Sequence, residues 1–83
     1  MARIVSKSEK GFSDARYRNL IGELVKARKH LGLSQEALAV RLGKHQQFVS
    51  RYEIGERRLD VAEFVDVACT LKLDPAILIK SIV

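Results

Sequence analysis

The sequence contains little of what several protein classes require. Its 83 residues include one cysteine, one proline, five glycines and no tryptophan. A single cysteine excludes an intrachain disulfide framework, and so few prolines, glycines and aromatic residues provide poor turn chemistry for a many-stranded sheet. No apolar run approaches the roughly eighteen residues of a membrane span. We therefore expect one small helical domain that resides in the cytoplasm.

Side chains that bind metals or perform catalysis are also few. His30, His45 and Cys69 do not have the spacing of a metal-ligand motif, and no Ser-His-acid or Cys-His arrangement has support from spacing. We expect no metal, no cofactor and no enzymatic activity. Cys69 is predicted to be a small core residue, with a redox role as the alternative.

Positive charge, by contrast, is in excess and is unevenly placed. Fifteen Lys and Arg against ten Asp and Glu give a net charge of +5, which favours a polyanionic partner. Residues 1–58 carry thirteen basic and six acidic side chains, whereas residues 59–83 carry two and four. We expect the first of these two parts to face the anion.

Start and stop signals divide most of the chain into five helices. Residues 1–12 show no sustained period and are predicted to form a flexible basic arm, followed by one domain over residues 13–83. Short polar side chains and a proline mark the helix starts: Ser34, Asp60 with Glu63, and Asp74 before Pro75. Gly32 and Gly43 are stop signals. The helices are predicted at residues 13–31, 35–42, 46–53, 61–71 and 75–82.

Two of these helices have apolar faces that we expect to be buried. In the first helix the apolar residues of this face are Leu20, Ile21, Leu24, Val25 and Leu31, and Arg28 falls on the same side. In the fourth helix it consists of Val61, Phe64, Val65, Ala68 and Leu71.

The third predicted helix has one apolar side and one polar side. At about 100° per residue, Phe48, Val49 and Tyr52 fall in one arc. The opposite arc holds Gln46, Gln47, Ser50, Arg51 and Ile54. Gln can bond adenine and Arg can bond guanine in a bidentate way, so this side suits the reading of base edges. An ordinary solvated face would look similar.

The segment around this helix carries a family pattern. It consists of Leu33-Ser34-Gln35-Glu36-Ala37-Leu38-Ala39, then Leu42-Gly43, then Gln46-Gln47-Phe48-Val49-Ser50-Arg51-Tyr52-Glu53 with Gly55. This pattern resembles the helix-turn-helix of the phage lambda repressor/Cro type, also called XRE-type, and the match extends from about residue 17 to 78. The resemblance implies an all-α, five-helix lambda-repressor-like domain. Its helix-turn-helix, at about residues 35–54, would be formed by the second and third helices, with the third in the major groove of DNA.

The resemblance also implies roles for individual residues. Four side chains match positions that contact base edges: Gln46, Gln47, Ser50 and Arg51. Gln35 matches a phosphate-binding glutamine at the start of the second helix. Arg28 and Glu53 match positions that pair in some relatives to hold the first helix against the end of the third. In the flanking loops, Lys44, Arg57 and Arg58 look like phosphate contacts, with an exposed non-contacting charge as the alternative for each, and Arg41 is a weaker candidate.

Two residues depart from the family pattern. His45 occupies the N-cap of the third helix, where Ser or Thr is usual, so it either contacts phosphate or merely replaces the cap. Phe48 stands where relatives often have a small residue. We expect it to be partly buried in the core, with contact to a thymine methyl as the alternative.

The C-terminal residues 76–83 are apolar nearly all round. We expect the fifth helix and this tail to form a homodimer contact, with closure of the bundle over the first helix as the alternative. The leading hypothesis is a DNA-binding transcriptional regulator, a repressor that binds a palindromic operator in double-stranded DNA as a dimer. The alternative is an antitoxin-like module whose main partner is another protein, bound through the apolar tail, with DNA binding secondary. A non-specific nucleoid binder is disfavoured because the glutamine-rich face suits phosphate poorly.

Overall fold

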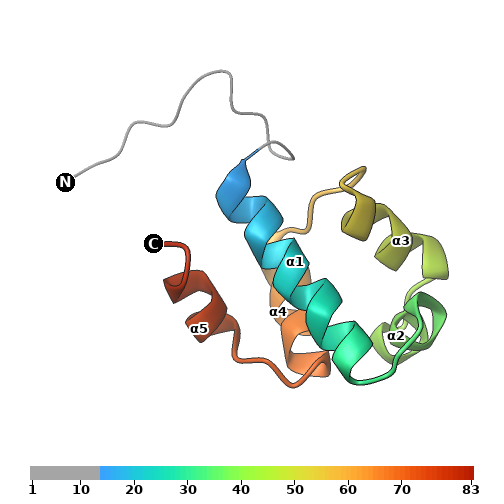
Figure 1. Cartoon of the computed structure of the whole chain (residues 1–83). Helices are drawn as coiled ribbons and strands as arrows, with labels where there is room; N and C mark the ends of the chain where they lie inside the picture. The colour runs from blue at the N-terminus through green and yellow to red at the C-terminus, as the bar shows by residue number, and fades with distance from the viewer. Residues whose placement is uncertain (1–13) are drawn as a thin grey trace.

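A computed structural model describes residues 14–83, and the predicted arm at residues 1–12 lies outside this range. The described chain forms five helices and no strand (Figure 1). Their bounds are α1 Ala15–His30, α2 Gln35–Leu42, α3 Gln46–Ile54, α4 Val61–Thr70 and α5 Pro75–Lys80. All five predicted helices are therefore present, and the prediction of an all-α fold is confirmed.

Four of the five described helices, all except α3, begin where a short polar side chain accepts hydrogen bonds from first-turn amides. Asp14 accepts from the amide of Arg16 at 2.8 Å, and Ser34 accepts from that of Ala37 at 2.9 Å. Asp60 and Glu63 form the predicted capping box at the start of α4. Each cap satisfies an amide that has no partner within its own helix.

A left-handed glycine makes the turn between α2 and α3. Gly43 has φ +69°, a conformation that side chains with a Cβ rarely adopt. The amide of Lys44 then donates to the carbonyl of Ala39 at 2.9 Å, which closes α2. The chain can therefore leave α2 and begin α3 within a few residues.

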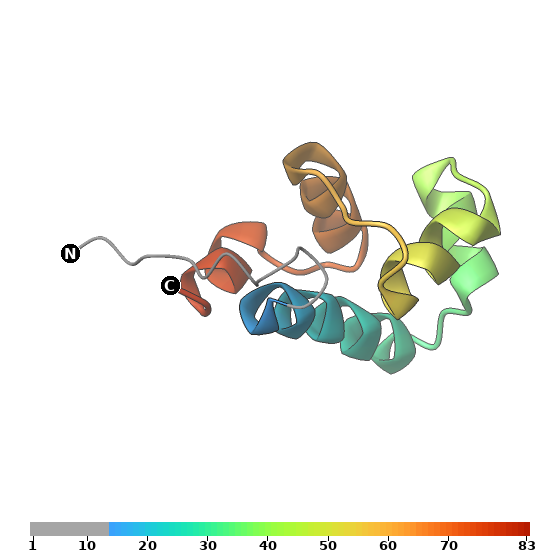
Figure 2. The same ribbon diagram turned by 90° about the horizontal axis from the view of Figure 1, so that it is seen from above.

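α1 lies between α5 on one side and α2 and α3 on the other, with α4 behind it in the view of Figure 1 (Figures 1 and 2). All five helices contribute side chains to one hydrophobic core. The core residues are Leu20, Ile21, Leu24, Leu38, Ala39, Val49, Tyr52, Phe64, Val67, Ala68, Leu71 and Leu78. α3 is thus held by its apolar side, which leaves its other side to solvent.

The predicted inner face of α4 is partly wrong. Val61 is 80% exposed and Val65 is 38% exposed, whereas Val67 is fully buried. The buried residues of α4 and its C-cap follow the i, i+3, i+4, i+7 spacing of one helix face, at Phe64, Val67, Ala68 and Leu71. Val65 lies about 100° round the helix from Phe64, and Val61 stands at the first position of the helix.

Three further expectations are corrected. Cys69 is exposed, not a core residue, because it lies about 100° round α4 from the buried Ala68. Leu31 is 38% exposed because α1 ends before it and it serves as the C-cap. α5 ends at Lys80 and not at Ile82. There the hydroxyl of Ser81 donates to the carbonyl of Leu78 at 2.6 Å, and the following amides bond three residues back in a tighter turn.

Candidate nucleic-acid interface

The polar side of α3, which carries the candidate base-reading residues, faces solvent. Val49 and Tyr52 are fully buried and fix the helix on its apolar side. Gln46, Gln47 and Arg51 are exposed, and Ser50 is half-buried. The structure therefore brings the four candidate base-reading residues together along one accessible face of a single helix.

A buried ion pair holds the far end of α3 against α1. The guanidinium of Arg28 donates to the carboxylate of Glu53 through Nε at 2.7 Å and through Nη2 at 3.0 Å. Its Nη1 donates to the carbonyl of Leu33 at 2.8 Å. The side chains are only 10% and 7% exposed, and the hydrogen bond to Glu53 raises the pKa of Arg28. The pairing expected from the family resemblance is confirmed.

Gln35 belongs to the same network. Its Nε2 donates to Oε1 of Glu53 at 2.9 Å, so the first residue of α2 is joined to the end of α3. Its predicted phosphate role stays a prediction. No local sequence signal indicates the contact with Glu53, because the two residues are eighteen positions apart and lie on different helices.

The loop after α3 contains a second ion pair that sequence reasoning missed. Arg57 donates to Glu63 through Nη1 at 2.8 Å and through Nη2 at 2.7 Å. The guanidinium of Arg57 is the largest cause that lowers the pKa of Glu63 to about 2, and the carboxylate in turn raises the pKa of Arg57. Since Glu63 also closes the capping box of α4, this pair joins the loop to the start of α4.

Aromatic rings lie beside the cations of both loops. The Nζ of Lys44 is 5.2 Å from the ring centroid of Phe48, and the Cζ of Arg57 is 5.0 Å from the same centroid. Phe48 is half-buried against the core and meets Tyr52 edge to face at 5.6 Å, which fits the expectation of partial burial.

The two remaining flanking residues differ in their surroundings. The Cζ of Arg58, an exposed residue, lies 4.6 Å from the ring centroid of Tyr17. His45 occupies the N-cap of α3, and its side chain makes no capping hydrogen bond.

Known proteins share this arrangement. Residues 24–78 match the family model described as Helix-turn-helix. The chain is also similar to a solved structure, an XRE-family like protein from Pseudomonas syringae pv. tomato str. DC3000. The two are 46% identical, the match covers 82% of this chain and 83% of that one, and the TM-score is 0.77. Comparison with curated proteins gives no match.

The chain belongs to the XRE-type helix-turn-helix family. Membership confirms the lambda-repressor-like fold, and it identifies this XRE-type protein as a DNA-binding regulator in general terms. Proteins of this family are typically non-enzymatic. Within residues 14–83, no helix is long and apolar enough to cross a membrane, and no three His, Cys, Asp or Glu side chains group as metal ligands do.

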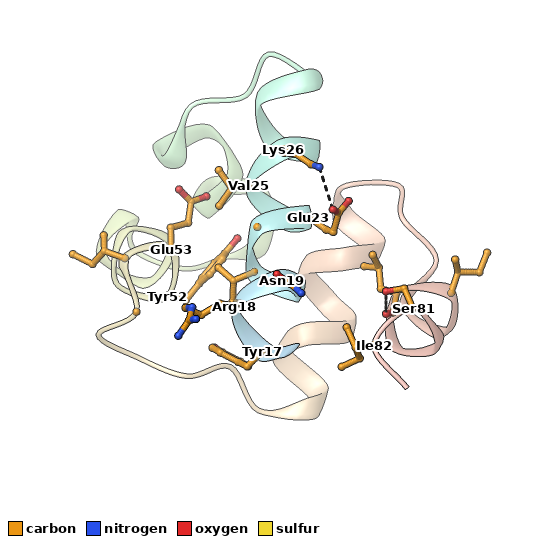
Figure 3. Close-up of a pocket in the computed structure, with 16 residues that line it drawn as sticks. Tyr17, Arg18, Asn19, Glu23, Val25, Lys26, Tyr52, Glu53, Ser81 and Ile82 are labelled. Atoms are coloured by element: carbon orange, nitrogen blue, oxygen red, sulfur yellow. Dashed lines mark hydrogen bonds and ion pairs between the residues drawn. The ribbon is translucent and has the colours of Figure 1, made fainter. Parts of the chain in front are cut away.

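The XRE-type domain also has a groove on the side of α1 that is shown in Figure 3. It has a volume of about 1020 Å³ and lies between α1, the end of α3 and α5. Its polar rim includes an ion pair between Lys26 and Glu23 at 3.2 Å. Beneath it lies Tyr52, whose buried hydroxyl has no hydrogen-bond partner among the described residues.

Proposed function

We propose that this protein is a transcriptional repressor that binds a palindromic operator as a homodimer, with α3 in the major groove. The observation that carries the proposal is the outward face of α3, where two amides, a hydroxyl and a guanidinium stand opposite the buried Val49 and Tyr52. Gln46, Gln47, Ser50 and Arg51 read base edges through hydrogen bonds. Family membership supports this reading.

Four side chains around this face bind the phosphate backbone and fix the register of α3. Lys44 precedes α3, while Arg57 and Arg58 follow it, so cations stand in the loops at both of its ends. Gln35 begins α2, where the helix N-terminus attracts an anion, and its contact with Glu53 holds the side chain in place. Phosphate contacts of this kind position a protein on DNA, and the base contacts specify the sequence.

The homodimer forms through α5 and the tail. Ile77 is 65% exposed, Ile79 is 44% exposed and Val83 is fully exposed. Exposed apolar side chains favour a partner, and a two-fold contact through α5 would place two copies of α3 about 34 Å apart on DNA.

The decisive experiment is the selection of bound sequences from a random pool of duplex DNA. A repressor of this kind should enrich an inverted repeat whose half-sites lie about one helical turn apart. Enrichment of a single half-site would argue against the dimer. Recovery of unrelated sequences would argue against specific binding altogether.

A second candidate function, an antitoxin-like module, is favoured by one further surface. Val61, Val65 and Ile79 line a mostly apolar groove of about 420 Å³ between α1, α4 and α5, away from α3. No residue of α3 lines this groove, so a protein partner there would leave the reading face open, although it would cover Arg58. Capture of a protein that remains bound at high salt, together with weak DNA selection, would favour this function over the first.

A further inference from the structure

Phe48 stands at the meeting point of three segments that surround the reading helix. It lies in the first turn of α3, and its ring is close to Lys44 from the turn before α3 and to Arg57 from the loop after it. Both distances, 5.2 and 5.0 Å, are within the range of about 6 Å over which a cation is attracted to the face of an aromatic ring. One ring therefore contacts cations that are thirteen positions apart in the sequence.

The ring of Phe48 is itself held in place by the core. Phe48 meets the fully buried Tyr52 at a centroid distance of 5.6 Å and an interplanar angle of 68°. Such an edge-to-face contact restricts the ring, whose own side chain has few rotatable bonds. Lys44, by contrast, has a long flexible side chain whose ordering costs entropy when it binds a ligand.

Arg57 is held on two sides. Glu63 binds its Nη1 and Nη2, and Nη1 also donates to the carbonyl of Arg58 at 3.2 Å. Among the described residues, the Nε–H and one Nη2–H of Arg57 have no acceptor. The guanidinium thus keeps donors for a phosphate while the ring of Phe48 and the carboxylate of Glu63 fix its place.

We propose that Phe48 is a positioning residue for DNA binding. Its ring holds the cationic groups of Lys44 and Arg57 in place before DNA arrives, so that both reach phosphates with little loss of side-chain freedom. This inference rests on the proposed function. It also accounts for the large side chain at a position where the family pattern often has a small one.

The test is a double-mutant cycle measured by binding to a short labelled duplex of random sequence. Phe48→Leu keeps apolar bulk and removes the aromatic face, and it should weaken binding about 3- to 10-fold. Phe48→Tyr restores the ring and should restore binding to the wild-type level. In a background that carries Lys44→Ala and Arg57→Ala, Phe48→Leu should change the affinity by less than about twofold.

A matched control separates positioning from packing. Phe64→Leu removes an aromatic ring from the core at a site where no cation lies over the ring among the described residues. It should lower the melting temperature without weakening DNA binding by the folded protein. Circular dichroism checks that every variant is folded at the temperature of the titration.

A signal independent of DNA comes from nuclear magnetic resonance. The ε-methylene protons of Lys44 should be shifted upfield by the ring in the wild type and in Phe48→Tyr, and the shift should be lost in Phe48→Leu. Equal weakening by Phe48→Leu in both backgrounds, or no weakening in the wild type, would overturn the role of Phe48 and leave the proposed function standing. Failure of the wild type to bind any duplex would overturn both.

Discussion

The two halves of the domain are stabilised in different ways. Around α3, charged side chains connect separate segments, through Arg28 with Glu53 and through Arg57 with Glu63. α5, in contrast, is held by the buried Leu78 and by its Asp74 cap, and it leaves Ile77 and Ile79 exposed. Hydrogen-bonded ion pairs fix direction as well as distance, whereas apolar contacts tolerate small displacements. The half that we propose contacts the DNA phosphates therefore carries the directional contacts.

Loss of Glu53 should have the largest effect on the α3 half. Glu53→Ala leaves Arg28 buried without its carboxylate and also removes the partner of Gln35, so the free energy of unfolding should fall by about 3–5 kcal/mol. Denaturation in urea measures this change.

The control for that change is the exposed pair of Glu23 and Lys26, whose side chains are 49% and 74% exposed. Glu23→Ala should lower stability by less than about 0.5 kcal/mol, because solvent already screens the pair. Equal effects of the two variants would mean that burial does not distinguish these ion pairs.

Within the α3 half, base-reading and phosphate-binding residues should respond differently to substitution by alanine. Arg51→Ala should weaken binding to a selected operator by about 1–3 kcal/mol and relax discrimination at one base pair. Arg58→Ala should weaken binding to all sequences alike and lower the salt slope by about one. Titrations against operator and random duplexes at several salt concentrations distinguish the two. An unchanged sequence preference in Arg51→Ala would contradict its assignment to the reading face.

Acid should weaken the contact between the loop and α4. The pKa of Glu63 is lowered from 4.5 in the unfolded chain to about 2, mainly by Arg57, so the folded state favours the ionised carboxylate. This stability is present above about pH 4.5 and is lost as the pH falls through about 2.

Glu63→Gln tests that dependence, since glutamine still fits a capping box while it removes the charge. The variant should lose at most about 1 kcal/mol at pH 7, because the partner Arg57 is partly exposed. Between pH 5 and pH 2 its stability should fall less than that of the wild type, as followed by urea denaturation at each pH. Parallel curves of stability against pH for the two proteins would mean that the charge of Glu63 does not contribute to the acid dependence.

Local signals in the sequence predicted the helices well. Ser34, Gly43 and the pair Asp60 and Glu63 act through hydrogen bonds within a few residues, and each stands where it was expected. Long-range contacts were harder to predict from the sequence. The family resemblance gave Arg28 with Glu53, but no local rule links Arg57 to Glu63 or two cations to one ring, because these contacts depend on how the loop returns to α4.

The apolar faces were predicted less well. In α4, Val61, Phe64, Val65 and Val67 are all apolar, so periodicity alone allows more than one face. Packing into the shared core buries Phe64 and Val67 and leaves Val61 exposed. The exposed base-reading candidates on α3 agree with the helical wheel, yet their contacts with DNA stay predictions.

A last comparison concerns the hydroxyls of two tyrosines, Tyr17 on α1 and Tyr52 on α3. The hydroxyl of Tyr17 accepts a hydrogen bond from the amide of Leu59 at 3.0 Å, whereas that of Tyr52 is buried without a partner in the described chain. Burial is the main cause that raises the pKa of Tyr52, so this hydroxyl stays neutral. Tyr52→Phe should leave stability unchanged or raise it by up to about 1 kcal/mol, since it removes an unsatisfied polar group.

Tyr17→Phe is the matched variant, and it should lower stability by about 1 kcal/mol because the Leu59 amide loses its acceptor. Thermal and urea denaturation of both variants measure the contrast in sign. If Tyr52→Phe proved as destabilising as Tyr17→Phe, the Tyr52 hydroxyl would have to bind a partner in solution, such as a water molecule at the floor of the groove beside α1. The end of α3 would then be held by a third polar contact in addition to Arg28 and Gln35.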